Sequence, residues 1–163
     1  MKKYIAIPLV VGVFVITAFG QRTPKFTQYP VKVEKAKAKG VDFREKGTRT
    51  YKTRLSEGFA EGVNFAGHYV IVGWGCGTGC TNAAVINART GHVIWPEEFY
   101  NLDASYGDGY SDVQIDFKKN SRLMIIHGRP GTTNESGPTG KSGDYYYEWR
   151  NESFHQLKFV EKK

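Results

Sequence analysis

The sequence predicts a mainly β protein, an antiparallel meander of about six to seven strands with one short N-terminal helix. Short apolar and aromatic segments, separated by turn residues, recur from the middle of the chain to its end. The 163 residues include 19 Gly, 10 Phe, 10 Tyr and 3 Trp, a composition typical of strands and turns. Hydrophobic residues make up 40% of the chain and charged residues 24%, which excludes wholesale disorder and allows one domain with its own core.

The first twenty residues have the pattern of a secretory signal peptide. Two lysines precede an apolar run at residues 5–19. Small residues at Ala18 and Gly20 then favour cleavage before Gln21. The run is shorter than the roughly 20 residues that span a membrane, and no cysteine follows it as a site of lipid attachment. We therefore expect a periplasmic or secreted mature protein with no stable membrane anchor.

A basic N-terminal arm is expected at residues 21–47, ahead of a single β-rich domain at residues 48–163. Residues 21–54 carry a net charge of +8 and residues 55–163 a net charge of −3, so the overall +7 belongs to the arm and the leader. We expect the arm to be mobile or loosely packed, either solvated or docked on the acidic domain. It could instead bind a polyanion. Nucleic acid is not expected as a partner of an exported protein, and no aromatic residues are interleaved with the lysine run at residues 32–39.

One short helix is expected between Thr48 and Gly62. Tyr51, Leu55 and Phe59 recur at intervals of four residues, which places them on one helical face. Gly62 is positioned to end this helix.

Strand patterns then replace the helical period. The expected strands are residues 68–74, 83–87, 92–95, 112–117, 123–127, 145–149 and 154–160. They form three hairpin-like units that resemble parts of propeller blades, but the chain is too short to close a propeller. A curved sheet, an open barrel or a small sandwich is expected, with the helix packed against it.

Three features of these segments bear on function. Tyr145, Tyr147 and Trp149 alternate along one strand, which favours a face in the core over an exposed aromatic platform. Two loops, residues 96–111 and 128–143, are longer than the roughly 12 residues at which loops in compact domains are often functional. The first of these loops is rich in acidic and tyrosine side chains.

The two cysteines, Cys76 and Cys80, lie in a glycine-rich segment that reads WGCGTGC. In an exported protein, a disulfide that closes a tight loop is the leading interpretation of such a pair. A loop this short contributes about 2 kcal/mol to stability in the chain-entropy account. A reactive thiol or a metal site remains an alternative, although the C-x-x-x-C spacing does not match the C-x-x-C redox motif.

The sequence contains no recognisable catalytic constellation. Its four histidines show no metal-binding spacing, and the glycines around the cysteines lack the nucleotide-binding patterns. The acidic loop does not fit the spacing of a calcium-binding loop. No metal or cofactor is therefore expected.

Three segments carry a resemblance. Residues 63–69 read VNFAGHY, residues 74–80 read WGCGTGC and residues 88–93 read ARTGHV. Together they resemble a family of exported bacterial proteins of uncharacterised function. The resemblance implies a periplasmic or secreted location, and it provides no catalytic residue to carry over.

These observations predict a non-enzymatic binding module that presents a disulfide-fixed loop and two long loops. The partner would be an envelope protein or an anionic envelope polymer, and inhibitor or immunity-type roles belong to this class. The residues expected to contribute to the contact surface are Asn64, His68, Trp74, Thr78, Tyr106, Asp108 and Tyr110. The alternative is an envelope hydrolase or thiol enzyme that uses Cys76 or Cys80 with His68 as the base.

Overall fold

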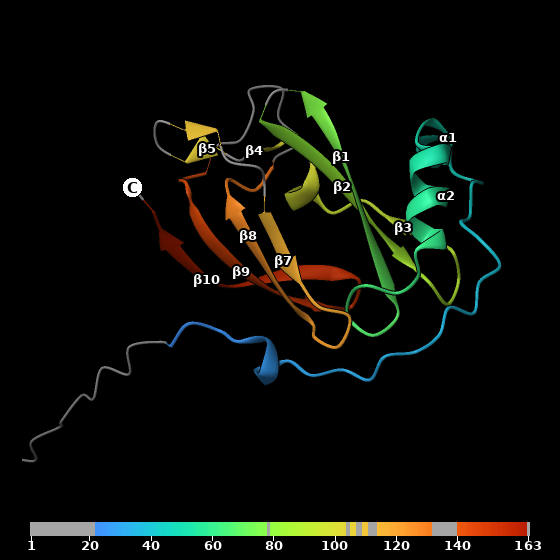
Figure 1. Ribbon diagram of the computed structural model, residues 1–163, viewed down its shortest axis with the longest axis horizontal. Coiled ribbons are helices and arrows are strands. Elements are labelled where there is room, and N and C mark those ends of the chain that lie inside the picture. The colour runs from blue at the N-terminus through green and yellow to red at the C-terminus, as the bar shows by residue number, and fades with distance from the viewer. Residues whose placement is uncertain are drawn as a thin grey trace, which may run out of the picture.

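A computed structural model of the chain confirms the mainly β class (Figure 1). The described residues are 22–77, 79–103, 105–106, 109–110, 114–131 and 140–162. They contain two four-stranded antiparallel sheets and a two-stranded ribbon, and these strands do not join into a closed barrel. The expected signal peptide lies outside the described residues.

The first sheet is built on one long hairpin. Strand β1 (Tyr69–Gly77) pairs with β2 (Cys80–Asn87) along almost its whole length. The other edge of β2 is shared by two short strands, β3 (Val93–Ile94) at one end and β4 (Leu102–Asp103) at the other.

The second sheet is a meander in the order β10-β9-β8-β7. Its strands are β7 (Gln114–Phe117), β8 (Leu123–Gly128), β9 (Gly143–Arg150) and β10 (Ser153–Glu161). The ribbon consists of β5 (Ser105–Tyr106) and β6 (Gly109–Tyr110). The seven strands predicted from the sequence all exist, and β1 and β2 extend further toward the cysteines than the residue pattern indicated.

The two sheets pack face to face as a small sandwich. In Figure 1, β7 to β10 lie to the left and β1 to β3 to the right. Ile71 and Val85 of the first sheet belong to the same buried cluster as Met124 and Ile126 of the second. The predicted aromatic stripe on β9 also lies in this core, and its Trp149 is 2% exposed. Alternation of apolar side chains along the strands therefore produces the central layer of the fold.

Two helices cover the outer face of the first sheet, where the sequence predicted one. Helix α1 (Lys46–Thr50) and helix α2 (Lys52–Ala60) are separated at Tyr51, whose backbone leaves the helical region at φ −107° and ψ 22°. Leu55 of α2 is fully buried with Val70 of β1 and Ile86 of β2. The chain turns out of α2 at Gly62, where φ is +92°.

The N-terminal arm is packed along the sandwich, contrary to the expectation of a loose segment. We call residues 22–45 the strap; in Figure 1 it crosses from the second sheet to the helices. At its start, the short 3₁₀ helix η1 (Phe26–Gln28) helps to cover the outer face of the second sheet, with Phe26 and Tyr29 packed there. At its end, Val41 and Phe43 pack into the cluster beneath the helices.

Backbone groups and one ion pair hold the middle of the strap. The amide of Glu34 donates to the carbonyl of Gly67 at 2.7 Å, and the amide of Lys37 donates to that of Ala88 at 2.9 Å. The Glu34 carboxylate also pairs with Arg89 at 2.5 Å. A Cβ at Gly67 would lie 2.6 Å from the Lys32 carbonyl oxygen, so the strap approaches more closely than a larger residue would allow. The lysines of the strap remain exposed.

The contact between α2 and β1 gives a stability prediction. A methyl group at Gly58 would lie 2.5 Å from Val72 Cγ2, which belongs to a buried and conformationally stiff side chain. We expect Gly58→Ala to destabilise the protein by up to about 2 kcal/mol, because overpacking outweighs the gain of about 1 kcal/mol in helix propensity. Urea unfolding measures the effect.

Gly47→Ala in α1 is the matched control, because nothing lies within 4 Å of its added Cβ. It should be neutral or stabilising by up to about 1 kcal/mol. Equal gains in stability from the two substitutions would contradict the close packing of α2 on β1.

Candidate functional site

The expected disulfide is present at the end of the β1–β2 hairpin. Cys76 and Cys80 are bonded with their Cα atoms 5.2 Å apart. Gly77 pairs with Cys80, the register shifts between Gly75 and Gly77, and Gly79 adopts a left-handed φ of +67° within the turn. Glycine tolerates this backbone conformation without steric cost. Since the chain has only these two cysteines, no thiol is free, which is consistent with an oxidising compartment.

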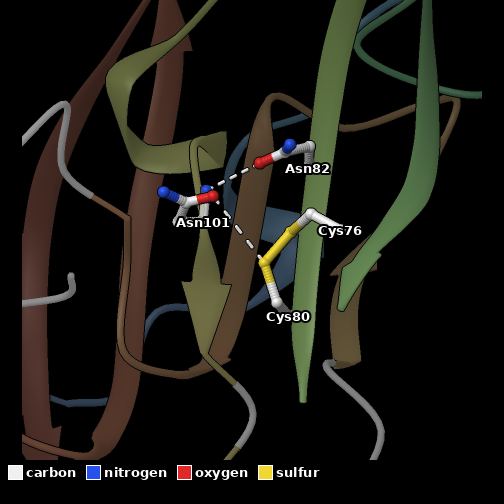
Figure 2. The surroundings of a disulfide bond; sticks show 4 residues. All are labelled: Cys76, Cys80, Asn82 and Asn101. Atoms are coloured by element: carbon white, nitrogen blue, oxygen red, sulfur yellow. Dashed lines mark hydrogen bonds between the residues drawn. A yellow bond between two sulfur atoms is a disulfide. The ribbon is translucent and has the colours of Figure 1, made fainter. Parts of the chain in front are cut away.

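Two asparagines attach the segment before β4 to the disulfide (Figure 2). The Asn101 amide donates to Asn82 Oδ1 at 2.7 Å. Asn101 Oδ1 also lies 3.7 Å from Cys80 Sγ, a polar contact rather than a hydrogen bond because a disulfide sulfur carries no proton. Asn101 itself has a φ of +54°, a conformation that asparagine adopts more readily than most residues. The hairpin end and the chain that enters β4 are therefore held together.

A pocket of about 160 Å³ lies beside this corner, and we call it the aromatic pocket. Its lining includes Tyr51, Trp74, Asn82, Trp95, Glu97 and Tyr100. The Tyr51 ring lies 4.6 Å from that of Trp74 and 5.6 Å from that of Trp95, measured between centroids. The two tryptophan rings are 6.1 Å apart and nearly perpendicular, at 82°.

Strand alternation determines where this pocket opens. Val70, Val72 and Trp74 share the face of β1 that the helices cover, and Trp74 pairs directly with Asn82 on β2. The apolar stripe is buried at Val70 and only half-buried at Trp74. Tyr51, at the break between the helices, covers one side of the Trp74 ring. The pocket thus forms where the helix-covered stripe reaches the end of the sheet.

The other wall comes from the chain after β3. Trp95 and Pro96 lead into the 3₁₀ helix η2 (Glu97–Phe99), whose Phe99 is fully buried as an anchor. Trp95 is 39% exposed and Tyr100 is 48% exposed. Buried and exposed aromatic residues therefore alternate along one short segment.

Carboxylates gather around this segment, and its Glu97 lines two pockets. A second, more polar pocket is lined by Glu97, Glu98 and Glu152 together with Phe154. Burial raises the pKa of Glu98, and the neighbouring charge of Glu97 acts in the same direction. The turn that carries Glu152 is joined to the first sheet, because Asn87 Nδ2 donates to Glu152 Oε1 at 2.7 Å.

The residues predicted for the contact surface are not all brought together. Trp74 lines the aromatic pocket, whereas Asn64 has a structural role, accepting from the Ile71 amide at 2.8 Å and donating to the Ile71 carbonyl at 3.0 Å. Tyr106 and Tyr110 lie on the paired strands β5 and β6.

Thr78 and Asp108 lie outside the described residues, as do the side chains of Tyr106 and Tyr110. Tyr51, Asn82, Trp95 and Tyr100 were not among the predicted site residues. The aromatic residues on either side of Pro96 could have indicated two of them, Trp95 and Tyr100.

His68 and the cysteine pair lie at opposite ends of β1. The eight residues from His68 to Cys76 correspond to about 26 Å of extended chain. His68 is half-buried beside the strap, where burial and the positive charge of Arg89 lower its pKa. The structure does not bring this histidine to Cys76 or Cys80.

A histidine between two carboxylates is a further group that sequence reasoning did not find. His127 Nδ1 lies 2.7 Å from Asp144 Oδ1, and its Nε2 lies 3.2 Å from Asp116 Oδ2. Lys162 Nζ also contacts Asp144, at 2.6 Å. These groups meet only through the register of the second sheet, in which His127 is directly opposite Asp144.

Within the described ranges, no group of three or more metal-ligating side chains is arranged to hold a metal ion. The same residues include no helix long and apolar enough to cross a membrane. Comparisons of the chain with protein-family models, with curated proteins and with solved structures found no match. The family resemblance therefore stays a prediction.

The disulfide gives a direct chemical prediction. Unreduced protein, unfolded in denaturant, should expose no group that reacts with a thiol reagent. The Cys76→Ser/Cys80→Ser double variant should lose about 2 kcal/mol of unfolding free energy and keep its fold, because the loop that it opens is short. Titration of two thiols in the unreduced wild type would contradict the bonded state.

The His127 group gives a prediction about pH. Burial acts to raise the pKa of Asp144, but hydrogen bonds from Lys162 and His127 outweigh it, so this pKa is lower than usual. A carboxyl group whose pKa is lower in the folded than in the unfolded protein stabilises the fold at pH values above its unfolded pKa of about 3.9. This stabilisation is lost as the pH falls through the pKa of the group in the folded protein. Asp144→Asn should therefore lose about 1–3 kcal/mol at pH 7.

The difference between Asp144→Asn and wild type should shrink below about pH 4, measured by unfolding across a pH series. Asp116→Asn serves as the control, since the Asp116 carboxylate is 58% exposed and its loss should change stability by less than about 1 kcal/mol. A difference for Asp144→Asn that stays constant down to pH 2 would show that its charge is not the cause.

Proposed function

We propose that the chain is an exported, non-enzymatic binding module whose contact surface consists of the aromatic pocket and the adjoining disulfide corner. One observation carries this proposal. Among the described residues, three large hydrophobic side chains are exposed, and two of them, Trp95 and Tyr100, line the same pocket. Exposed apolar side chains scattered singly need no explanation, but a group of them at one concave site is typical of a binding surface.

The energetics of Trp95 support a functional reason for its exposure. Full burial of a large apolar side chain contributes about 1.5–3 kcal/mol to stability. The neighbouring Phe99 obtains this contribution in the core, whereas Trp95 and Tyr100, at 39% and 48% exposure, obtain only part of it. Aromatic side chains of this kind are enriched among the residues that dominate binding energy.

Export is supported by two independent features. The first twenty residues have the signal-peptide pattern, and disulfides persist mainly in oxidising compartments such as the periplasm or the extracellular space. We infer a periplasmic or secreted location. The partner is then a component of the cell envelope. The exposed lysines of the strap would attract an envelope polymer with anionic groups at long range, which favours such a polymer as the partner. A protein partner, as for an inhibitor or immunity-type protein, is the other outcome of the test below.

A thiol enzyme is the less supported candidate. The nucleophile of such an enzyme is a thiolate, and both sulfur atoms are committed to the disulfide. The histidine proposed as the base lies about 26 Å of strand away from Cys76.

The proposal is tested by photo-cross-linking in the native envelope. A photoreactive residue in place of Tyr100 should capture an envelope polymer or protein in much higher yield than the same residue in place of Val33. Val33 is the matched control, because it is similarly exposed but belongs to the strap. Equal capture from both positions, or activity of the purified protein on envelope substrates that Cys76→Ser abolishes, would contradict the proposal.

A further inference from the structure

We propose that the aromatic pocket binds one pyranose ring of a neutral saccharide. This inference rests on the proposed function, which it deepens by assigning a chemical class of ligand. Volume, ring geometry and the polar groups of the lining each support it.

The volume of the pocket fits a single six-membered ring. Its 160 Å³ is close to the roughly 150 Å³ of a protein cavity that takes up one benzene molecule. A folded peptide segment or a complete nucleotide would not fit in this space. One sugar unit fits, and because the pocket is open to solvent, the rest of a longer glycan can extend outside.

The arrangement of the rings suits a saccharide. A pyranose has C–H groups on its faces and hydroxyl groups around its edge, so it packs on aromatic surfaces while its edge stays polar. The rings of Trp74 and Trp95 are nearly perpendicular, so one ring can pack on the face of the sugar and the other against its edge. The partly exposed rings of Trp95 and Tyr100 offer further apolar surface to the remainder of a glycan.

Besides the aromatic residues, two polar side chains of the lining, Asn82 and Glu97, supply a donor and an acceptor. Asn82 Oδ1 is occupied by the amide of Asn101, which leaves the Nδ2 group of Asn82 to donate, and no partner for Nδ2 is found in the described part of the chain. Glu97 provides an exposed carboxylate, which only accepts. A hydroxyl group both donates and accepts, so adjacent hydroxyls match this pair.

Other ligand classes match the lining less well. An ammonium group would gain from the aromatic faces and Glu97, but it would meet the N–H donors of Asn82. An apolar side chain would leave both polar groups without partners, at a cost of about 1–3 kcal/mol each if they are buried. An anionic sugar unit inside the pocket would be repelled by Glu97, so any anionic groups of an envelope polymer would lie outside the pocket.

The pocket is held in shape before any ligand binds. The disulfide and the contact between Asn82 and Asn101 fix the corner behind it. A Cβ at Gly131 would overlap the backbone of Tyr100, so that segment is tightly packed from behind as well. Preorganisation lowers the entropy lost on binding, which matters for a ligand that makes few contacts.

The test is titration of the full chain, with its disulfide intact, by isothermal calorimetry. The probes are the neutral oligosaccharides triacetylchitotriose and cellotriose, with choline as a cationic probe. We expect at least one oligosaccharide to bind with a Kd on the order of 0.1–1 mM, as suits one buried ring. Trp95→Ala and Asn82→Asp should each weaken binding at least tenfold, and Val33→Ala should not change it.

Asn82→Asp is the decisive variant, because it keeps an oxygen that accepts from Asn101 and replaces the N–H donors with an anionic oxygen that can only accept. No binding of either oligosaccharide at 20 mM, unchanged binding by Asn82→Asp, or a preference for choline would overturn the saccharide inference. The binding-module proposal would stand in those cases if the Tyr100 cross-link still captured an envelope component. Cleavage of a bound oligosaccharide would support the saccharide site and overturn the non-enzymatic proposal.

Discussion

The structure depends on burial of the β1–β2 hairpin on both of its faces. Val70 and Ile86 face the helices, whereas Ile71 and Val85 face the second sheet. A slip of one residue in the register would exchange these faces, so the packing on both sides fixes the pairing of the two strands. The position of everything at the end of the hairpin follows from this constraint.

The two-sided burial also explains why the site is rigid. The disulfide contributes little to global stability, but it closes a hairpin end whose register is already set. Trp74 and Asn82 are directly opposite one another just before that closure. The strap then holds the outer layers, because its two ends pack on opposite sides of the sandwich. A pocket with exposed aromatic rings is therefore maintained by a frame that does not need a ligand.

The strands and the disulfide could be predicted because their signals are local. Alternation identified β7 and β9, a short apolar run after a turn identified β8, and two close cysteines indicated a bond. The order of the strap could not be predicted, since the hydrogen bonds along its middle come from backbone amides and carbonyls, which every residue has. The pocket was found only in part for a similar reason. Tyr51 and Trp95 contact Trp74 only because separate elements pack together, and the spacing of these residues in the sequence does not indicate that contact.

The central claim is that ligands reach the protein at the aromatic pocket beside the disulfide. The three tryptophan indole N–H signals in an ¹⁵N-correlation spectrum test this most directly, because Trp149 is buried in the core and serves as an internal reference. On titration with envelope glycan fragments, the account predicts shifts for Trp74 and Trp95 and none for Trp149. Binding that left the Trp74 and Trp95 signals in place would contradict it.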